Sequence, residues 1–82
     1  MIDEKEAYKI AKEYSELIAY MYHIEREYVF GIFPNDQELS CGFVMNDDGT
    51  NARKIPMYTL FDYDEMVSQG KGEEINIENF DN

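Results

Sequence analysis

The spacing of the apolar residues changes near residue 22 from a helical to an alternating pattern, and this change limits the folds open to the chain. Up to Met21 an apolar side chain recurs every three or four positions, which is typical of one face of a helix. The positions are Ala7, Ile10, Ala11, Tyr14, Leu17, Ile18 and Met21. Asp3 and Glu6 form a capping-box pattern ahead of them. The sequence therefore predicts one long helix over residues 4–22.

From residue 27 onward the apolar residues alternate, which is typical of strands. Residues 27–33 (EYVFGIF) are rich in β-branched and aromatic side chains and are apolar on both faces, so we expect a central strand there. Turn-forming residues follow at 34–36 (PND), and residues 39–45 predict a second strand with one strongly apolar face.

The second half of the chain shows turn, strand and helix signals in succession. Residues 46–50 (NDDGT) predict a hairpin turn in which Gly49 takes a positive φ. Residues 51–57 predict a third strand, and Pro56 suits either the end of that strand or a position at the sheet edge.

A second helix and a last strand complete the predicted domain. Asp62 and Glu65 repeat the capping-box pattern and Gly70 is a stop signal, which predicts a helix of about two turns. Residues 74–77 (EINI) predict a short fourth strand with inward isoleucines. The order α-β-β-β-α-β predicts a single α+β domain over residues 1–82. In it, one long N-terminal helix packs on a mainly antiparallel four-stranded sheet.

The chain carries 18 acidic and seven basic residues, a net charge of −11 over 82 residues. The acidic excess is concentrated in residues 62–82, where Lys71 is the only base. Such a surface repels nucleic acids and anionic membranes and attracts basic proteins. With 44% apolar residues the chain is too apolar for a disordered acidic tail, so we expect a folded domain.

The cysteine content and the N-terminal residues indicate the cellular compartment of the protein. The single Cys41 excludes an intramolecular disulfide and fits a reducing environment. The N-terminal residues are charged throughout and lack the apolar centre of a signal peptide. No apolar run approaches the roughly 20 residues that span a bilayer. We therefore expect a cytoplasmic protein.

Residue types that perform catalysis are sparse. His23 is the only histidine, and no motif marks Cys41, Ser15, Ser40 or Ser68 as a nucleophile. His23 suits the C-terminal end of the predicted helix, where the dipole favours a cation. A pair of carboxylates could in principle perform acid–base chemistry, but no pocket signal accompanies them. We expect no catalytic residues and no enzymatic activity.

Cofactor motifs are missing as well. Residues 46–51 resemble a calcium loop, but with Gly49 at its sixth position the first and twelfth positions fall on Val44 and Ile55, which cannot ligate calcium. One cysteine and one histidine exclude zinc in practice. Residues 70–72 (GKG) lack the remainder of a phosphate-binding loop. We expect no cofactor, no metal and no direct contact with nucleic acid.

The sequence favours a recognition surface over residues 58–74, where aromatic and acidic side chains are interleaved. Tyrosine offers a large rigid contact area, and aromatic anchors inside an acidic surface suit a basic partner. Partly buried tyrosines beside a solvated acidic face would give the same pattern. The predicted partner-binding residues are Tyr58, Asp62, Tyr63, Asp64, Glu65, Glu73 and Glu74.

Three segments of the chain form a further pattern: the E-A-x-x-I-A run at residues 6–11, the turn at residues 46–49 and the Ile55-Pro56 pair. In these segments the chain resembles the small acidic immunity-type domains of bacterial polymorphic toxin systems. The resemblance implies a helix ahead of a strand pair and a role in neutralising a toxin. It does not extend to the last helix and strand. In size and charge alone the chain is also similar to phage anti-CRISPR proteins.

The sequence thus predicts a small acidic inhibitor that binds a basic, nucleic-acid-handling protein such as a toxin nuclease and blocks its substrate site. Its negative surface would act as a nucleic-acid mimic. A phage inhibitor of a CRISPR effector is the alternative of the same kind. A housekeeping interaction or dimerisation module, whose charge serves only solubility, is the alternative of a different class.

Overall fold

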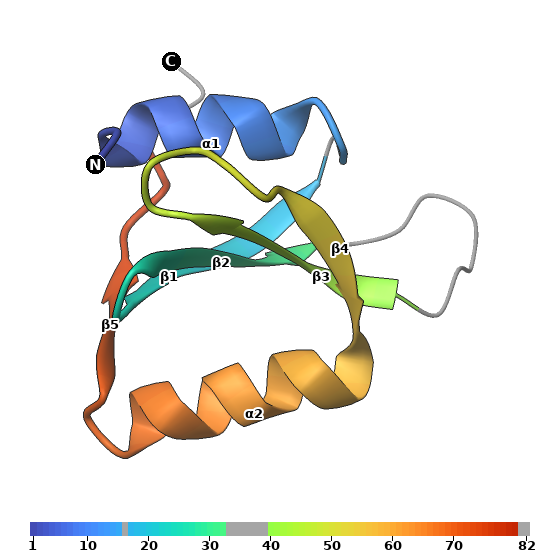
Figure 1. The fold of residues 1–82 in the computed structure, drawn as a ribbon, viewed down its shortest axis with the longest axis vertical. Coiled ribbons are helices and arrows are strands. Elements are labelled where there is room, and N and C mark those ends of the chain that lie inside the picture. Colours follow the sequence, from blue (N-terminus) through green and yellow to red (C-terminus); the bar gives the residue numbers. More distant parts are fainter. Residues whose placement is uncertain (16, 33–39, 81–82) are drawn as a thin grey trace.

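The structure, a computed structural model, describes residues 1–15, 17–32 and 40–80 and has three layers, with a five-stranded sheet between two helices (Figure 1). The elements are α1 (Glu4–Lys12), β1 (Ile18–Ile24), β2 (Glu27–Ile32), β3 (Ser40–Asn46), β4 (Arg53–Pro56), α2 (Met57–Ser68) and β5 (Gly72–Ile75). The sheet order is β4-β3-β2-β1-β5, and every pair of neighbours is antiparallel. The α+β class and the central position of β2 are confirmed.

The prediction of one long N-terminal helix is wrong, because α1 ends at Lys12 and the second half of the predicted helix is strand β1. The amides of Glu13 and Tyr14 donate to carbonyls only three residues back, which tightens the last turn. The Ser15 hydroxyl then bonds to the backbone of Leu17 and offers that backbone an alternative to the helix. The aromatic and β-branched residues that follow pair with β2 on one side and β5 on the other.

A bulge in β1 explains why this strand carries helical spacing. The register of β1 against β2 shifts between Ile18 and Tyr20, so one extra residue is inserted there. Because of that insertion, Ile18 and Met21 contact the same core beneath α1 although they are three residues apart. The sheet consequently has five strands rather than the predicted four, and the chain order is α-β-β-β-β-α-β.

The sheet is covered on both faces, and each face has its own core (Figure 1). The Asp3 carboxylate accepts a hydrogen bond from the Glu6 amide at 2.8 Å, which confirms the predicted cap of α1. Beneath α1 the buried side chains are largely aromatic and aliphatic: Ala7, Tyr8, Ala11, Met21, Tyr28, Phe30, Ile32, Phe43, Met45 and Ile75. Beneath α2 the buried set is smaller: Ile24, Val29, Val44, Ile55 and Leu60.

Helix α2 begins at Met57, five residues before the predicted capping box at Asp62, and that predicted start is wrong. Pro56 precedes the helix with extended backbone and provides no side-chain cap, so packing of Leu60 against the sheet outweighs the local capping signal. The twelve residues of α2 span about 18 Å, close to the width of four strand spacings of about 4.8 Å. The helix therefore carries the chain from edge strand β4 to edge strand β5.

The remaining predictions about the strands are mostly confirmed. Gly49 has φ +88° in the hairpin turn, and Gly70 has φ +80° just after α2. Pro56 ends β4, which is an edge strand. The last strand begins two residues earlier than predicted, at Gly72, and ends at Ile75. The predicted turn at residues 34–36 lies outside the described residues.

Candidate protein-interaction face of helix α2

The outer side of α2 exposes three large apolar side chains on its first two turns. Met57 is 44% exposed, Tyr58 is 74% exposed and Phe61 is 57% exposed. They follow one another at helical spacing, while Leu60 on the opposite side of the helix is buried against the sheet. The sheet thus holds α2 by one side and leaves an aromatic surface on the other.

Two carboxylates lie on the same outer side. Asp62 follows Tyr58 by four residues and Glu65 follows Phe61 by four, so each acid neighbours an aromatic residue along the helix. Both acids are exposed, and α2 contains no lysine or arginine to neutralise them. We call this surface the α2 outer patch; it consists of Met57, Tyr58, Phe61, Asp62 and Glu65.

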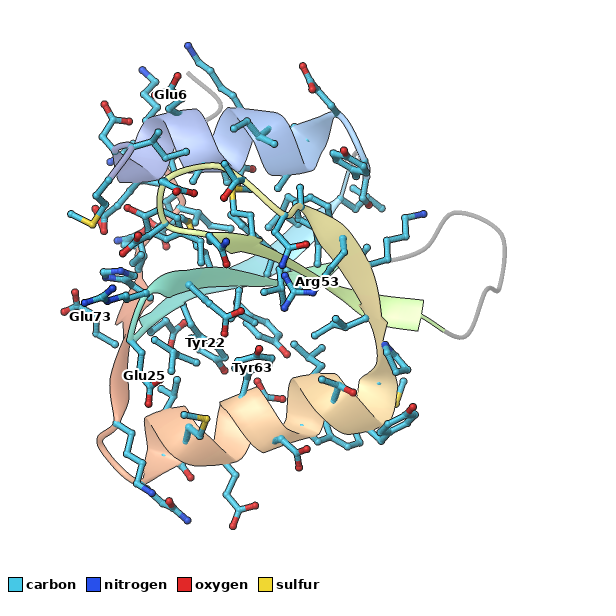
Figure 2. All side chains as sticks on the ribbon, in the orientation of Figure 1. Glu6, Tyr22, Glu25, Arg53, Tyr63 and Glu73 are labelled. Atoms are coloured by element: carbon cyan, nitrogen blue, oxygen red, sulfur yellow. The ribbon has the colours of Figure 1, made fainter. Side chains whose placement is uncertain are left out.

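Tyr63 points the other way, into the layer between α2 and the sheet (Figure 2). The hydrogen bond of Asp64 to Tyr20 of β1 places its carboxylate in the same layer. The Tyr63 hydroxyl donates to Glu27 Oε1 at 2.9 Å, and Arg53 Nη2 donates to Glu27 Oε2 at 3.2 Å. The Tyr20 hydroxyl donates to Asp64 Oδ2 at 3.3 Å. These side chains tie α2 to β1, β2 and β4, so Tyr63 and Asp64 are internal contacts rather than parts of the exposed surface.

The environment keeps the tyrosines of this layer protonated. Burial, together with the hydrogen bond to Glu27 and its charge, raises the pKa of Tyr63 to about 12. Burial also raises the pKa of Tyr22 to about 12, with further contributions from a hydrogen bond to Asp64 and from the charges of Asp64 and Glu74. Both hydroxyls are therefore neutral hydrogen-bond donors at physiological pH, which suits a structural role.

The last two predicted residues lie on edge strand β5, away from the α2 outer patch. Glu73 is opposite His23 in the register with β1, and Glu74 is opposite Tyr22, so the two acids lie on opposite faces of the sheet. Both are exposed, and Figure 2 shows Glu73 at the edge of the sheet. The seven predicted residues therefore divide into three outer residues, two internal residues and two edge residues.

Sequence reasoning missed Met57 and Phe61, because it started the second helix at Asp62. The signal that could have found them was the spacing of Leu60, Tyr63 and Val67, which continues the buried stripe of α2 back to its first turn. A helix extended to Met57 would have placed Phe61 opposite that stripe and therefore on the outer side.

The geometry around His23 does not form a catalytic arrangement among the described residues. His23 Nε2 lies 3.3 Å from Asp47 Oδ2, and its ring packs on that of Tyr28 at 4.9 Å between centroids. The Ser68 hydroxyl donates to the carbonyl of Glu65 at 2.8 Å, within α2. The side chain of Cys41, which no sequence motif marks as a nucleophile, lies outside the described residues.

No group of three or more His, Cys, Asp or Glu side chains is arranged to hold a metal ion in residues 1–15, 17–32 and 40–80. The hairpin turn that resembles a calcium loop is closed internally, since Asp48 Oδ1 accepts hydrogen bonds from both the amide and the hydroxyl of Thr50. These hydrogen bonds lower the pKa of Asp48. The carboxylate thus stabilises the turn.

None of the described helices is both long enough and apolar enough to cross a lipid bilayer. Comparison with known proteins returned no matching family model, no matching curated protein and no matching solved structure. Inference about function therefore depends on the surface of the molecule itself.

Proposed function

We propose that this protein is a small, non-enzymatic acidic inhibitor that binds a basic protein through the α2 outer patch and blocks the partner's nucleic-acid site. The observation that carries the proposal is the combination of Tyr58 and Phe61, both more than half exposed, with the exposed acids Asp62 and Glu65 beside them on a helix that contains no lysine or arginine. Aromatic anchors bordered by charge are the arrangement found at binding hot spots. A net charge of −11 would steer a basic partner towards the protein.

A basic partner suits this surface better than a second copy of the chain does. A symmetric dimer through the α2 outer patch would place Asp62 and Glu65 of one copy close to the same acids of the other. No base within α2 could relieve that repulsion. A cationic surface would instead pair with both acids while its apolar side chains cover Tyr58 and Phe61.

The class of partner follows from charge and from the resemblance to immunity-type domains. A protein that handles nucleic acid presents a cationic groove, and an acidic body competes for that groove without reading any sequence. A toxin nuclease, with the inhibitor acting in the cytoplasm as its immunity protein, is the partner we propose. A CRISPR effector bound by a phage inhibitor is the second version of the same chemistry.

The test begins by capturing binding proteins from the native host with the tagged protein and measuring their association at low and high salt. We expect a basic nuclease whose activity the protein inhibits and whose association slows steeply as salt is added. The double variant Tyr58→Ala/Phe61→Ala should speed dissociation about 30-fold, as expected for loss of about 2 kcal/mol at a hot spot. Asp62→Asn/Glu65→Gln should slow association several-fold and change dissociation less.

Two matched controls separate the patch from general effects. Leu17→Ala removes another exposed apolar side chain, and Glu4→Gln/Glu13→Gln removes two exposed charges from α1 and its C-cap; both should bind as the wild type does. Binding that is insensitive to salt, or equally weakened by the controls, would refute the proposal. Self-association that disappears in Tyr58→Ala/Phe61→Ala would support the dimerisation module instead.

A further inference from the structure

The hydrogen-bond directions in the sheet can be followed from one contact at its central hairpin. The carbonyl of Arg26 accepts a hydrogen bond from the amide of Asp47 at 2.7 Å, so its backbone points toward β3. Backbone groups alternate in direction along a strand, so Glu27 points toward β1 and bonds to Ile24 across the two-residue turn. By the same alternation, the residue before Ile24, which is His23, directs its amide and carbonyl toward β5.

This alternation identifies the outward backbone groups of edge strand β5. Glu73 is opposite His23 and exchanges hydrogen bonds with it, so Gly72 and Glu74 direct their amides and carbonyls away from the sheet. An unbonded pair approaches closely, and an added Cβ at Gly72 would indeed lie 3.2 Å from the Cα of Ile24. Outside the pairing with β1, no backbone hydrogen bond among the described residues involves Gly72 or Glu74. The β5 edge, on the left in Figure 1, therefore presents two residues whose backbone groups are free to pair.

The opposite edge, β4, offers less to an added strand. Phe43 of β3 is opposite Phe30 and bonds to β2, so Lys54, which is opposite Phe43 in β4, directs its backbone outward. Pro56, two residues further along β4, also points outward but has no amide hydrogen. Lysine and proline are residues by which proteins protect a sheet edge from pairing. We therefore regard β5 as the edge that is open to strand addition.

The side chains of β5 are acidic on both faces of the sheet. Glu73 is opposite His23, whose ring packs on the core residue Tyr28, and so it lies on the α1 face. Glu74 is opposite Tyr22 and so lies on the α2 face. Consecutive residues of an added strand alternate between the same two faces, so two adjacent basic residues would meet one glutamate on each face. The β5 strand of a second copy would instead set acid against acid, with a net charge of −11 on each copy.

We propose that the β5 edge binds an extended basic segment of the protein partner as a sixth strand of the sheet, which deepens the proposed function and rests on it. The amides and carbonyls of Gly72 and Glu74 would form the hydrogen bonds to the added strand. Glu73 and Glu74 would pair with two adjacent basic residues of that strand. Main-chain pairing would provide affinity, while the two charges would favour a basic strand over a second copy of this chain.

The test uses the free protein and a hexapeptide of sequence TVKKVT with both ends blocked. Amide hydrogen exchange of the ¹⁵N-labelled protein is followed by NMR. Without peptide, the amides of Gly72 and Glu74 should exchange rapidly, and those of Glu73 and Ile75, which point toward β1, should exchange slowly. At about 90% saturation the peptide should slow exchange at Gly72 and Glu74 about tenfold and leave Glu73 and Ile75 nearly unchanged.

Two control peptides and two variants separate strand pairing from attraction between charges. TVKKVT that is N-methylated at both lysines keeps its charge but loses its central donors, and TVEEVT can pair but is acidic; neither should protect the β5 amides. Glu73→Gln/Glu74→Gln should weaken binding of TVKKVT about fivefold. Glu4→Gln/Glu13→Gln, which removes the same charge from α1 and its C-cap, should leave that binding unchanged.

Each outcome decides the proposal. Absence of saturable binding, equal protection along the whole of β5, equal binding of the N-methylated peptide or unchanged binding in Glu73→Gln/Glu74→Gln would overturn it. Protection of Gly72 and Glu74 that grows with protein concentration, without peptide, would assign the edge to a second copy instead. Tyr58→Ala/Phe61→Ala should retain peptide binding, because it leaves β5 intact. Failure of the peptide test therefore leaves the α2 outer patch to be tested by partner binding, and failure of partner binding leaves the peptide result standing.

Discussion

The two faces of the sheet are built from different chemistry. Beneath α1, aromatic and aliphatic side chains such as Phe30 and Phe43 are completely buried, and their rings pack at 6.0 Å between centroids. Beneath α2, a small aliphatic core is surrounded by tyrosines and carboxylates, with Tyr20 and Tyr63 each hydrogen-bonded to an acid. One helix is held mainly by apolar contact and the other partly by directed hydrogen bonds.

The two faces contribute differently to the fold: one mainly to its stability and the other mainly to the position of its helix. Burial of apolar surface is the dominant favourable term in folding, so the α1 face supplies most of the stability. The α2 face adds positional precision, because hydrogen bonds to fixed partners define how the helix sits on the sheet. The layer that is positioned in this way carries the α2 outer patch.

Truncating the α1 core should have the largest effect. Phe43→Ala removes a fully buried ring that packs on Phe30 and Tyr14, and it should lower the free energy of unfolding by about 3–5 kcal/mol. Tyr63→Phe on the α2 face removes only a hydrogen bond to Glu27 and should cost about 1–2 kcal/mol. Urea denaturation measures both, and Phe43→Leu gives a milder change if the alanine variant does not fold. A larger loss for Tyr63→Phe than for Phe43→Ala would contradict the comparison.

Filling the space at Gly31 should have an intermediate effect. Gly31→Ala places a methyl group where the Tyr20 ring lies, so we expect a loss of about 1–3 kcal/mol and displacement of that ring. In a Tyr20→Ala background the same substitution should cost much less, which a double-mutant cycle measures.

Gly70→Ala serves as the control for that cycle. Its cost arises from the left-handed backbone at φ +80°, with no side chain nearby, so Tyr20→Ala should not relieve it. Equal costs for Gly31→Ala with and without the Tyr20 ring would show that the ring does not determine the packing there.

Raising the pH above about 10 should loosen the α2 face. The pKa values of Tyr22 and Tyr63 are raised to about 12, above the ordinary value of about 10, so the folded state holds these protons more tightly than the unfolded state does. Their contribution to stability is therefore complete below about pH 10 and is lost as the pH rises towards about 12. Absorbance of tyrosinate at about 295 nm, followed together with far-UV circular dichroism, measures both changes.

Tyr63→Phe supplies the control for the titration. It should remove one late-ionising tyrosine and leave the others unchanged. Ionisation of all seven tyrosines in one step near pH 10, while the fold persists, would contradict the assignment.

Local signals predicted the parts of the fold that depend on turn and cap chemistry. The Asp3 cap, the positive φ of Gly49 and the helix stop at Gly70 are all present. The end of α1 at residue 12 was not predictable, because the competing helical pattern was itself valid. The start of α2 at residue 57 was missed, although the spacing of Leu60, Tyr63 and Val67 indicates it. Helical spacing continues through Ile18 and Met21, and only the bulge in β1 makes the same spacing fit a strand.

The candidate site was predicted in part. Tyr58, Asp62 and Glu65 lie on the exposed side of α2, whereas Tyr63 and Asp64 face the sheet. Charge and aromatic content identify a region of the sequence, but they do not give the helical phase that decides which side chains reach solvent. The phase is set by where α2 begins and by which of its residues the sheet buries.

By itself the sequence determined the net charge and the turn positions, and it predicted a folded domain of the α+β class. These properties depend on residue type and short-range geometry. The tertiary structure decided that residues 18–24 form a strand, that α2 starts at Met57 and that its aromatic residues face outward. Those outcomes depend on pairing with β2 and β5 and on burial against a sheet made from distant parts of the chain. Such long-range contacts outweigh the local preferences for helix or strand, which amount to about a few tenths of a kcal/mol per residue.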